Sequence, residues 1–347
     1  MSKIAMIGAG AWGTALSLVL GRTGRHEVEL WAWEKDVCDS INRDRTNARF
    51  LPGHRIPECV RATNSLSAVI RQAEIVVSAV PSQHCRHIFE TITPHLAPEM
   101  MIVSATKGLE QGTLLRMTEV ICRVARGKRR VGALSGPTFA VEVARGDPAA
   151  ITVASEDHEL MQTVQREFGD LAFRVYTNHD VIGVELGGAL KNVIAIAAGV
   201  CDGLGLGYNS IAALITRGLA EMTRLVAASG GRSETMAGLA GLGDLVLTST
   251  GALSRNRSVG VELGRGRKLP EIMEAMHGMV AEGVFTTNAA VLLARRHGVE
   301  MPITEQMHLI LHEGKSPRDA IQDLMMRSSK SELHAPSRLA AGKVIER

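Results

Sequence analysis

The stretch "KIAMIGAGAWGTALSLVL", residues 3–20, opens with a short apolar run, turns on three glycines and continues with helical periodicity. Its glycines have the spacing G-x-G-x-x-G, which binds the pyrophosphate of a dinucleotide when it joins a strand to a helix. We expect Gly8 to make the tight turn, Gly10 to admit a pyrophosphate, and Gly13 to let helix and strand pack closely. Unpaired N–H groups at the helix N-terminus would favour the anion. The stretch therefore predicts the first unit of a dinucleotide-binding domain.

Further strands and helices alternate along the first half of the chain. Apolar runs typical of buried strands lie at 27–33, 74–82, 100–108, 130–136, 149–155 and 173–178, and an amphipathic helix is predicted at 157–169. This alternation predicts an α/β fold, a Rossmann-like doubly wound and mainly parallel sheet. Ligands bind such sheets beyond the carboxyl ends of the strands, so we expect 81–82, 107–108 and 136–138 to line one crevice.

The strand pattern ends near residue 178, and helical periodicity follows. Predicted helices lie at 212–229, 269–276, 286–298 and 303–314. We therefore expect two domains, a nucleotide-binding domain at 1–179 and an all-α substrate domain at 180–347.

Composition excludes several classes of protein. The net charge of +3 and the 3% of aromatic residues argue against a nucleic-acid partner. Five scattered cysteines without a C-x-x-C pair indicate a reducing, cytoplasmic location. The longest apolar run, 193–201, is too short for a membrane span. His308 and His312 are four residues apart but lack a further ligand, so no metal site is predicted.

Lys191 is the charged residue in the apolar segment "LGGALKNVIAIAAG", residues 186–199. On a helix it shares a face with Gly188, Ala195 and Gly199, and we expect these small residues to leave room for another molecule. Alternatively, the lysine reaches solvent or pairs with a carboxylate elsewhere. Apolar surroundings and a second ammonium group, Lys107, would lower its pKa and make it a usable acid or base near neutral pH.

Several segments together carry a resemblance to a known family. They are "GAGAWGTAL", "ATKGLE", "SGPTFAVEVA", "GALKNVIAIAAGVCDGLGLGYN", "GLAGLGDLVLT" and "LSRNRSVG". In this order and over nearly the whole chain, they resemble the bacterial NAD(P)-dependent glycerol-3-phosphate dehydrogenases. The resemblance implies reduction of dihydroxyacetone phosphate to sn-glycerol 3-phosphate for phospholipid synthesis, and a homodimer.

The resemblance also implies roles for individual residues. Lys191 is the expected acid/base, and NAD or NADP is the expected cofactor. The residues expected around the substrate are Lys107, Gly136, Thr138, Asp244, Ser254, Arg255 and Asn256. Besides the three glycines, the expected cofactor contacts are Ala11, Trp12, Trp33, Lys107, Ala140, Arg255, Val280 and Glu282.

The chemistry of these positions agrees with the expected roles. Ser254 precedes a helical stretch and is a predicted N-cap, with Arg255 beside it as a fork for phosphate, although "SRNRS" alone is also typical of an exposed loop. Asp244 suits a substrate hydroxyl but equally suits an N-cap or a buried ion pair. Glu34 would bind the ribose hydroxyls of NAD and repel the 2′-phosphate of NADP. The adjacent Lys35 would not repel that phosphate, so we expect both cofactors to work.

Two other functions remain open at this point. A β-hydroxyacid dehydrogenase would share the architecture and a helical lysine but bind a carboxylate; Lys107 and the segment 254–256 favour a phosphate instead. A non-catalytic NAD(P)H-sensing protein would have no need of a lysine among small residues.

Overall fold

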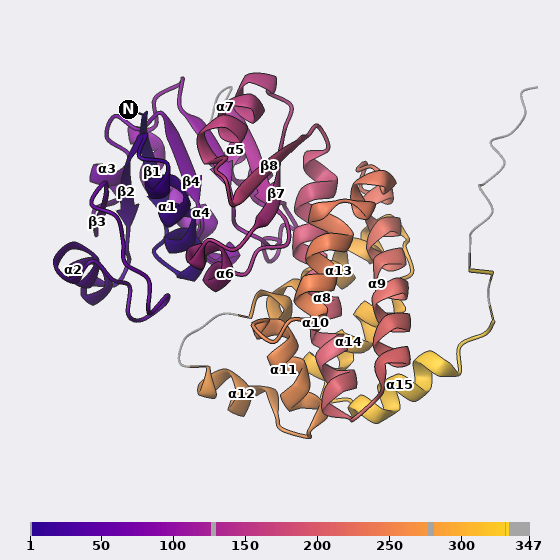
Figure 1. The fold of residues 1–347 in the computed structure, drawn as a ribbon. Coiled ribbons are helices and arrows are strands. Elements are labelled where there is room, and N and C mark those ends of the chain that lie inside the picture. The colour runs from indigo at the N-terminus through magenta and orange to yellow at the C-terminus, as the bar shows by residue number, and fades with distance from the viewer. Residues whose placement is uncertain (1, 126–129, 277–280, 330, 333–347) are drawn as a thin grey trace, which may run out of the picture.

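The strands form one sheet in the first half of the chain, and helices make up the second half (Figure 1). The computed structural model describes residues 2–125, 130–276, 281–329 and 331–332. The strands are β1 (Ser2–Ile7), β2 (His26–Trp31), β3 (Val60–Thr63), β4 (Ile75–Ser78), β5 (Met101–Ser104), β6 (Arg130–Ser135), β7 (Ala149–Ser155) and β8 (Phe173–Asn178).

The order of the strands, β3-β2-β1-β4-β5-β6-β7-β8, is that of a doubly wound fold extended by two strands. All neighbours are parallel except β6 and β7, which are antiparallel. The predicted fold class is therefore confirmed. The sequence prediction missed the four-residue edge strand β3, which is too short to show a clear alternation. The order reverses between β1 and β4, where ligands bind in this fold.

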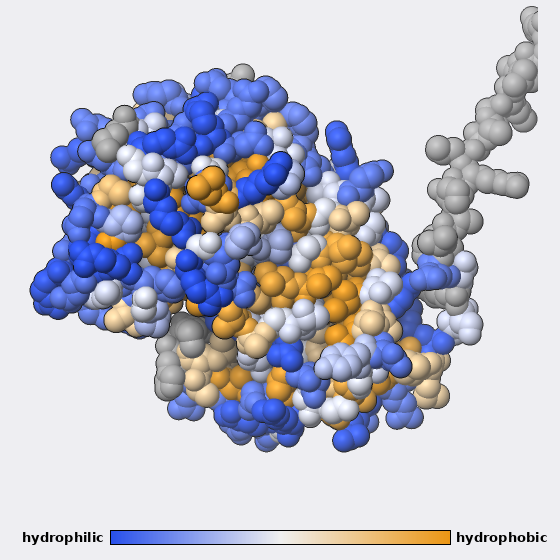
Figure 2. Space-filling model, in the orientation of Figure 1, coloured by the Kyte–Doolittle hydropathy of each residue, from blue (hydrophilic) through white to orange (hydrophobic). Residues whose placement is uncertain are grey.

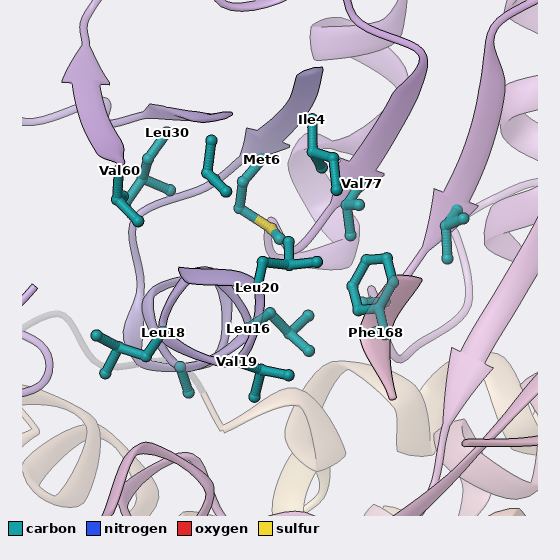
Figure 3. Packing of buried hydrophobic residues seen from close by; sticks show 14 of the residues in the cluster. Ile4, Met6, Leu16, Leu18, Val19, Leu20, Leu30, Val60, Val77 and Phe168 are labelled. Carbon is teal, nitrogen blue, oxygen red and sulfur yellow. The ribbon is translucent and has the colours of Figure 1, made fainter. Parts of the chain in front are cut away.

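Helices cover both faces of the sheet, and their apolar side chains pack against the strands to form a buried core on each face. They are α1 (Ala11–Arg22), α2 (Lys35–Asp44), α3 (Leu66–Val69), α4 (Cys85–Ile92), α5 (Met117–Ala125), α6 (Ala140–Arg145) and α7 (His158–Phe168). Figure 3 shows one face, where Leu16 and Leu20 of α1 lie close to Met6 of β1 and Phe168 of α7. The opposite face packs on α3, α4 and α5. This double cover leaves the central strands β4 and β5 almost fully buried, whereas β2 and β8 alternate buried and exposed residues in part.

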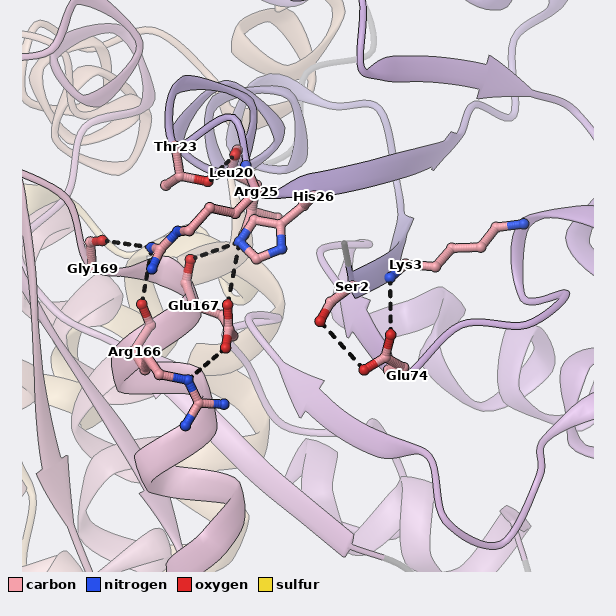
Figure 4. Close-up of polar contacts among 10 residues, drawn as sticks. All are labelled: Ser2, Lys3, Leu20, Thr23, Arg25, His26, Glu74, Arg166, Glu167 and Gly169. Atoms are coloured by element: carbon pink, nitrogen blue, oxygen red, sulfur yellow. Dashed lines mark hydrogen bonds and ion pairs between the residues drawn. The ribbon is translucent and has the colours of Figure 1, made fainter.

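Polar contacts tie the amino ends of the strands together (Figure 4). The buried His26 places Nε2 3.2 Å from the carbonyl oxygen of Glu167, at the end of α7. Arg25 donates to the carbonyls of Arg166 and Gly169 at 3.1 and 3.3 Å. These bonds lie at the opposite end of the strands from the glycine turn, so they stabilise the sheet without entering the predicted site.

The second half is built around α8 (Val181–Gly203), which is buried along nearly its whole length. The helices that follow are α9 (Tyr208–Ala228), α10 (Asp244–Thr250), α11 (Arg255–Gly264), α12 (Leu269–Ala275), α13 (Glu282–His297), α14 (Pro302–His312) and α15 (Pro317–Met325). Asp180 caps α8 by accepting from the N–H of Gly183 at 2.9 Å. Val184 of α8 also packs on Ala133 and Ala154 of the sheet, so α8 contacts both halves.

The apolar run at 193–201 belongs to a helix that is longer than the sequence prediction assumed. By length and composition, the 23 residues of α8 could cross a membrane, but 89% of its most apolar window is buried within the protein. Its apolar side chains therefore face the core of the helical half.

Helices α8 and α11 pack with direct backbone contact. Gly199 and Gly203 of α8 face Gly260 and Gly264 of α11, and a Cβ atom at Gly199 or at Gly260 would lie 2.0 Å from a carbonyl oxygen of the other helix. We call these four residues the glycine seam. Because no side chain separates the two helices, the backbones themselves set the spacing between them.

Candidate active site

The glycine turn has the geometry expected of a dinucleotide cradle. Gly8 has a φ of +116°, and a Cβ there would lie 2.8 Å from the carbonyl oxygen of Ala79. A Cβ on Gly13 would lie 1.9 Å from the carbonyl oxygen of Gly8, which accounts for the close helix packing. At Gly10, the N-cap of α1, no atom lies within 4 Å of a Cβ position, and no side chain caps the helix. The free N–H groups and open space at this helix end fit a pyrophosphate.

The other expected cofactor residues lie around the same edge of the sheet. Ala11 and Trp12 begin α1, and the buried Nε1 of Trp12 has no partner among the described residues. Trp33 follows β2, is 77% exposed, and meets Trp31 edge-on with ring centres 6.1 Å apart. Ala140 begins α6. Val280 lies outside the described residues.

Two lysines share one buried carboxylate. Asp244, the first residue of α10, lies 2.6 Å from Nζ of Lys107 and 3.0 Å from Nζ of Lys191. Lys107 also donates to the carbonyl of Gly136 at 3.1 Å, which joins the ends of β5 and β6. Lys191 donates to Oγ1 of Thr248 at 2.7 Å, and Thr248 donates to Asp244 at 3.1 Å. Of the alternatives for Asp244, the structure thus has the buried ion pair.

The charges in this cluster shift the pKa of each partner. The pKa of Lys191 is lowered to about 8, chiefly by burial, because the charged form loses hydration. Asp244 opposes this shift, whereas Lys107 and Arg255 contribute to it. The predicted direction is therefore confirmed. Burial opposes ionisation of Asp244, but the two ammonium groups outweigh it and hold its pKa below the ordinary value.

The expectation of open space along the lysine face of α8 was wrong in two places. The site of a Cβ at Gly188 lies 2.4 Å from Oγ of Ser135, and that at Gly199 is filled by the backbone of α11. Small residues on a helix indicate close approach, but the approaching group here is the protein itself. The sequence prediction also missed Thr248, although it stands four residues after Asp244 and so shares its helix face.

Helix α11 begins as predicted. Ser254 is its N-cap, and its hydroxyl accepts from the N–H of Arg257 at 3.1 Å. Arg255, in the first turn, is exposed as a residue, but burial of its guanidinium lowers the pKa of this group, and the nearby Glu282 opposes that shift. Asn256 is buried and bonds to Asn192, the residue after Lys191, at 2.9 Å. The hydroxyl of Thr138 donates to the carbonyl of Gly136 at 3.2 Å.

Glu282 joins the two halves of the molecule. Its carboxylate, at the start of α13, accepts from N–H and Oγ of Ser82 at 3.1 and 2.7 Å, and from Gln83 at 3.3 Å. Burial raises the pKa of Glu282, and the bonds from Ser82 oppose that rise. A Cβ at Gly108, where φ is +148°, would lie 2.7 Å from the side chain of Ser82. The contact between the two halves at Ser82 therefore also requires a glycine at position 108. No sequence pattern pairs residues 200 positions apart.

Comparison with known proteins bears directly on this arrangement. Models described as the N-terminus and the C-terminus of NAD-dependent glycerol-3-phosphate dehydrogenase match residues 3–161 and 180–322. The chain belongs to the NAD-dependent glycerol-3-phosphate dehydrogenase family. The resemblance drawn from the sequence motifs is thereby confirmed.

Individual members of the glycerol-3-phosphate dehydrogenase family are similar over almost the whole chain. The enzyme of Koribacter versatilis strain Ellin345 is 66% identical, over 96% of this chain and 99% of its own. That of Acidobacterium capsulatum is 54% identical, over 96% and 100%; both are named glycerol-3-phosphate dehydrogenase (NAD(P)+). The crystal structure of glycerol-3-phosphate dehydrogenase from Coxiella burnetii, 43% identical, covers 94% of this chain and 99% of its own with a TM-score of 0.90.

The histidines and cysteines outside the Lys107–Asp244–Lys191 cluster show no metal-binding arrangement in the part of the chain that the structure describes. Among the described residues, no three His, Cys, Asp or Glu side chains are grouped to hold a metal ion. The rings of His308 and His312 on α14 are tilted by 47° to each other, with their centres 5.0 Å apart. All five cysteines are free thiols.

Proposed function

We propose that this member of the glycerol-3-phosphate dehydrogenase family interconverts dihydroxyacetone phosphate and sn-glycerol 3-phosphate, with Lys191 as the acid/base. The single observation that carries the proposal is the Lys107–Asp244–Lys191 cluster, in which a buried lysine has a pKa of about 8. A group that titrates near neutral pH can donate a proton in one direction and accept it in the other.

Residues 1–179 would hold the cofactor and residues 180–347 the substrate. The open helix end at Gly10 and the unpartnered Nε1 of Trp12 fit a dinucleotide. When bound, NADH or NADPH supplies the hydride for the carbonyl carbon of the substrate. Lys191 then stabilises the negative charge that develops on the carbonyl oxygen and donates its proton there, while Lys107 holds the neighbouring oxygens. Asp244 keeps both ammonium groups in place.

The phosphate would lie at the start of α11. The guanidinium of Arg255 offers a planar fork of donors, and the helix N-terminus adds a favourable field. A β-hydroxyacid dehydrogenase would instead bind the carboxylate of its substrate here. A non-catalytic NAD(P)H-sensing protein would need no proton donor.

The direct test is turnover of dihydroxyacetone phosphate with NADH and NADPH in separate assays. Because Glu34 disfavours a 2′-phosphate while Lys35 attracts it, we expect both cofactors to work. Their kcat/KM values should differ by less than about a thousandfold, or about 4 kcal/mol. No turnover with either cofactor would disprove the proposed function, and a larger difference would disprove the dual cofactor use.

The pH dependence of kcat/KM should reflect the ionisation of Lys191. Reduction requires its protonated form, which declines as the pH rises through the pKa of about 8. We therefore expect kcat/KM for reduction to fall about tenfold per pH unit above pH 8, and kcat/KM for oxidation to rise up to that pH. Initial rates measured in both directions from about pH 6 to about pH 10 check this. A profile for reduction that stays flat throughout would exclude Lys191 as the proton donor.

Arg255 gives a test of phosphate recognition. Arg255→Lys keeps the charge but loses the fork, so we expect a higher KM for dihydroxyacetone phosphate; Arg255→Gln should raise it more, by about ten- to a hundredfold. Unphosphorylated dihydroxyacetone should be far less affected. The measurement is kcat/KM for both ketones in the three proteins. Equal proportional losses would show that Arg255 does not read the phosphate.

We further propose a cytoplasmic homodimer that has no nucleic-acid partner and supplies phospholipid synthesis. Five free thiols and a net charge of +3 support the location and the absence of a nucleic-acid surface. Figure 2 shows hydrophobic residues gathered on one face over the helical half. Leu242, Val246 and Leu253, in or next to α10, are exposed hydrophobic residues of this half. Such a patch is typical of a subunit interface. A molar mass equal to that of a single chain, measured by light scattering, would contradict the proposed dimer.

A further inference from the structure

The loop that follows α2 makes direct hydrogen bonds to the glycine turn. Helix α2 ends at Asp44, and Arg45 adopts the left-handed conformation with a φ of +54°, which ends the helix. The guanidinium of Arg45 donates to the carbonyls of Ile56 and Val60 at 3.2 and 2.8 Å. The two ends of the loop at 45–60 are thus held together, and Asn47 within it reaches the turn.

The side-chain amide of Asn47 is engaged at both of its ends. Its Nδ2 donates to the carbonyl of Ala9 and to Oγ1 of Thr14, both at 2.8 Å. Its Oδ1 accepts from the N–H of Phe50 at 3.1 Å. The N–H of Phe50 can only donate, so the oxygen of Asn47 must face it, and both N–H groups of the amide face the turn.

The carbonyl of Ala9 receives a second donor from Thr14. Because the hydroxyl of Thr14 accepts from Asn47, its own proton is free for the carbonyl of Ala9, at 3.3 Å. Asn47 is 0% exposed, Thr14 1% and Ala9 4%, so water competes little for these bonds. We call Asn47, Thr14 and Ala9 the Asn47 network.

The Asn47 network orients the peptide unit between Ala9 and Gly10. In a trans peptide the C=O and the N–H of one unit point in opposite directions. The carbonyl of Ala9 points toward two buried side chains, so the N–H of Gly10 points away from the protein interior. This unit directly precedes α1, whose uncapped N–H groups fit a pyrophosphate. At this unit the anion therefore meets an N–H group rather than a carbonyl oxygen.

The glycine at position 10 makes such support necessary. Rotation of the peptide unit changes ψ of Ala9 and φ of Gly10, which is now −67°. Glycine adopts positive φ values about as readily as negative ones, so Gly10 offers little steric resistance to an inverted unit. The inverted unit would turn an acceptor oxygen toward the pyrophosphate. The two donors on the carbonyl of Ala9 oppose that rotation.

We propose that Asn47 is a positioning residue for the cofactor, which acts by holding the Ala9–Gly10 peptide unit in the orientation that receives the pyrophosphate. This inference rests on the dinucleotide site proposed above. It adds a residue that lies outside the strand, glycine turn and helix of the sequence motif. Asn47 is fully buried, so it acts through the turn rather than by contact with the cofactor.

The test is the affinity of Asn47→Asp for NADH, measured by fluorescence titration. This variant keeps the acceptor for Phe50 but loses both donors to the turn, so we expect Kd for NADH to rise about tenfold. At saturating NADH, kcat and KM for dihydroxyacetone phosphate should stay within about threefold of wild type, because the Lys107–Asp244–Lys191 cluster is unchanged.

ADP-ribose locates the effect within the cofactor. It carries the pyrophosphate without the nicotinamide, and its affinity can be measured by competition with NADH. We expect Asn47→Asp to weaken the binding of ADP-ribose in the same proportion as that of NADH, because the variant acts at the pyrophosphate.

Asn42 provides a matched control. Its amide exchanges two 2.8 Å bonds with the backbone of Ala62 in β3 and does not contact the glycine turn. Asn42→Asp therefore loses a donor to a carbonyl and keeps an acceptor for an N–H, as Asn47→Asp does. It should leave Kd for NADH within about twofold of wild type.

Thr14 separates loss of positioning from repulsion by the new carboxylate. Thr14→Val removes the hydroxyl between Asn47 and Ala9 without adding a charge, so we expect Kd for NADH to rise about fivefold. Thr14→Ser restores the hydroxyl and should bring Kd back to within about twofold of wild type. The Thr14 pair also provides the test if Asn47→Asp does not fold.

Three results would overturn the positioning role. The first is lower thermal stability of Asn47→Asp with an unchanged Kd for NADH, which would indicate a role in folding alone. The second is weaker binding in Asn47→Asp but not in Thr14→Val, which would indicate repulsion by the carboxylate. The third is a loss of affinity for NADH without one for ADP-ribose. Wild-type protein that binds NADH but does not reduce dihydroxyacetone phosphate would instead disprove the proposed function alone, since the role of Asn47 is measured by binding.

Discussion

Lys191→Ala is expected to lower kcat for dihydroxyacetone phosphate reduction by at least about 10²-fold, with nearly unchanged binding of NADH. The variant removes the ammonium group that lies 3.0 Å from Asp244 and 2.7 Å from Thr248, and with it the proposed proton donor. The dinucleotide cradle at Gly8, Gly10 and Gly13 belongs to other elements and should be unaffected. Steady-state kinetics and fluorescence titration with NADH measure the two quantities.

A matched lysine controls for loss of charge in the Lys191 test. Lys315 pairs with Asp323 outside the site, so Lys315→Ala should keep kcat within about twofold of wild type. If Lys191→Ala retains kcat within about fivefold of wild type, then Lys191 is not the acid/base. Lost binding of NADH in a folded variant would assign it to the cofactor site.

Gly260→Ala is expected to lower stability by about 3 kcal/mol or more, although alanine normally favours a helix over glycine. The added Cβ would lie 2.0 Å from the carbonyl oxygen of Ile196 and 2.9 Å from Cα of Gly199. Both are backbone atoms, so α11 must move away from α8. Activity should fall too, because α11 begins with Arg255 and α8 carries Lys191. The midpoint of thermal unfolding and kcat/KM measure both effects.

Gly207→Ala is the control for the glycine seam. Gly207 precedes α9, and no atom lies within 4 Å of a Cβ placed there. As an N-cap substitution it should cost no more than about 1 kcal/mol. A Gly260→Ala protein as stable as this control would show that the helices can separate freely at the seam.

The sequence predicted the nucleotide-binding half well because its signals are local. The turn at Gly8, Gly10 and Gly13 is defined by spacing alone, and Ser254 as an N-cap needs only its neighbours. Buried parallel strands are apolar throughout, which made most of them visible, whereas the short edge strand β3 was not.

The site was predicted less completely because its contacts join distant parts of the chain. Spacing showed which residues share a face with Lys191, but not what occupies that face. At Gly199 the occupant is α11, and the paired G-x-x-x-G spacings at 199–203 and 260–264 were the available signal. The bonds from Ser82 to Glu282 and from Asn256 to Asn192 depend on tertiary packing, which no local pattern encodes.

Helix α8 belongs to both halves of the molecule, and this limits how the enzyme can open and close. Val184 packs on Ala133 and Ala154 of the sheet, while the rest of the helix forms the centre of the helical core. A hinge rotation of one half about the other would have to break one of these two apolar contacts. Substrate entry and product release therefore require a smaller movement than a hinge rotation of one half about the other.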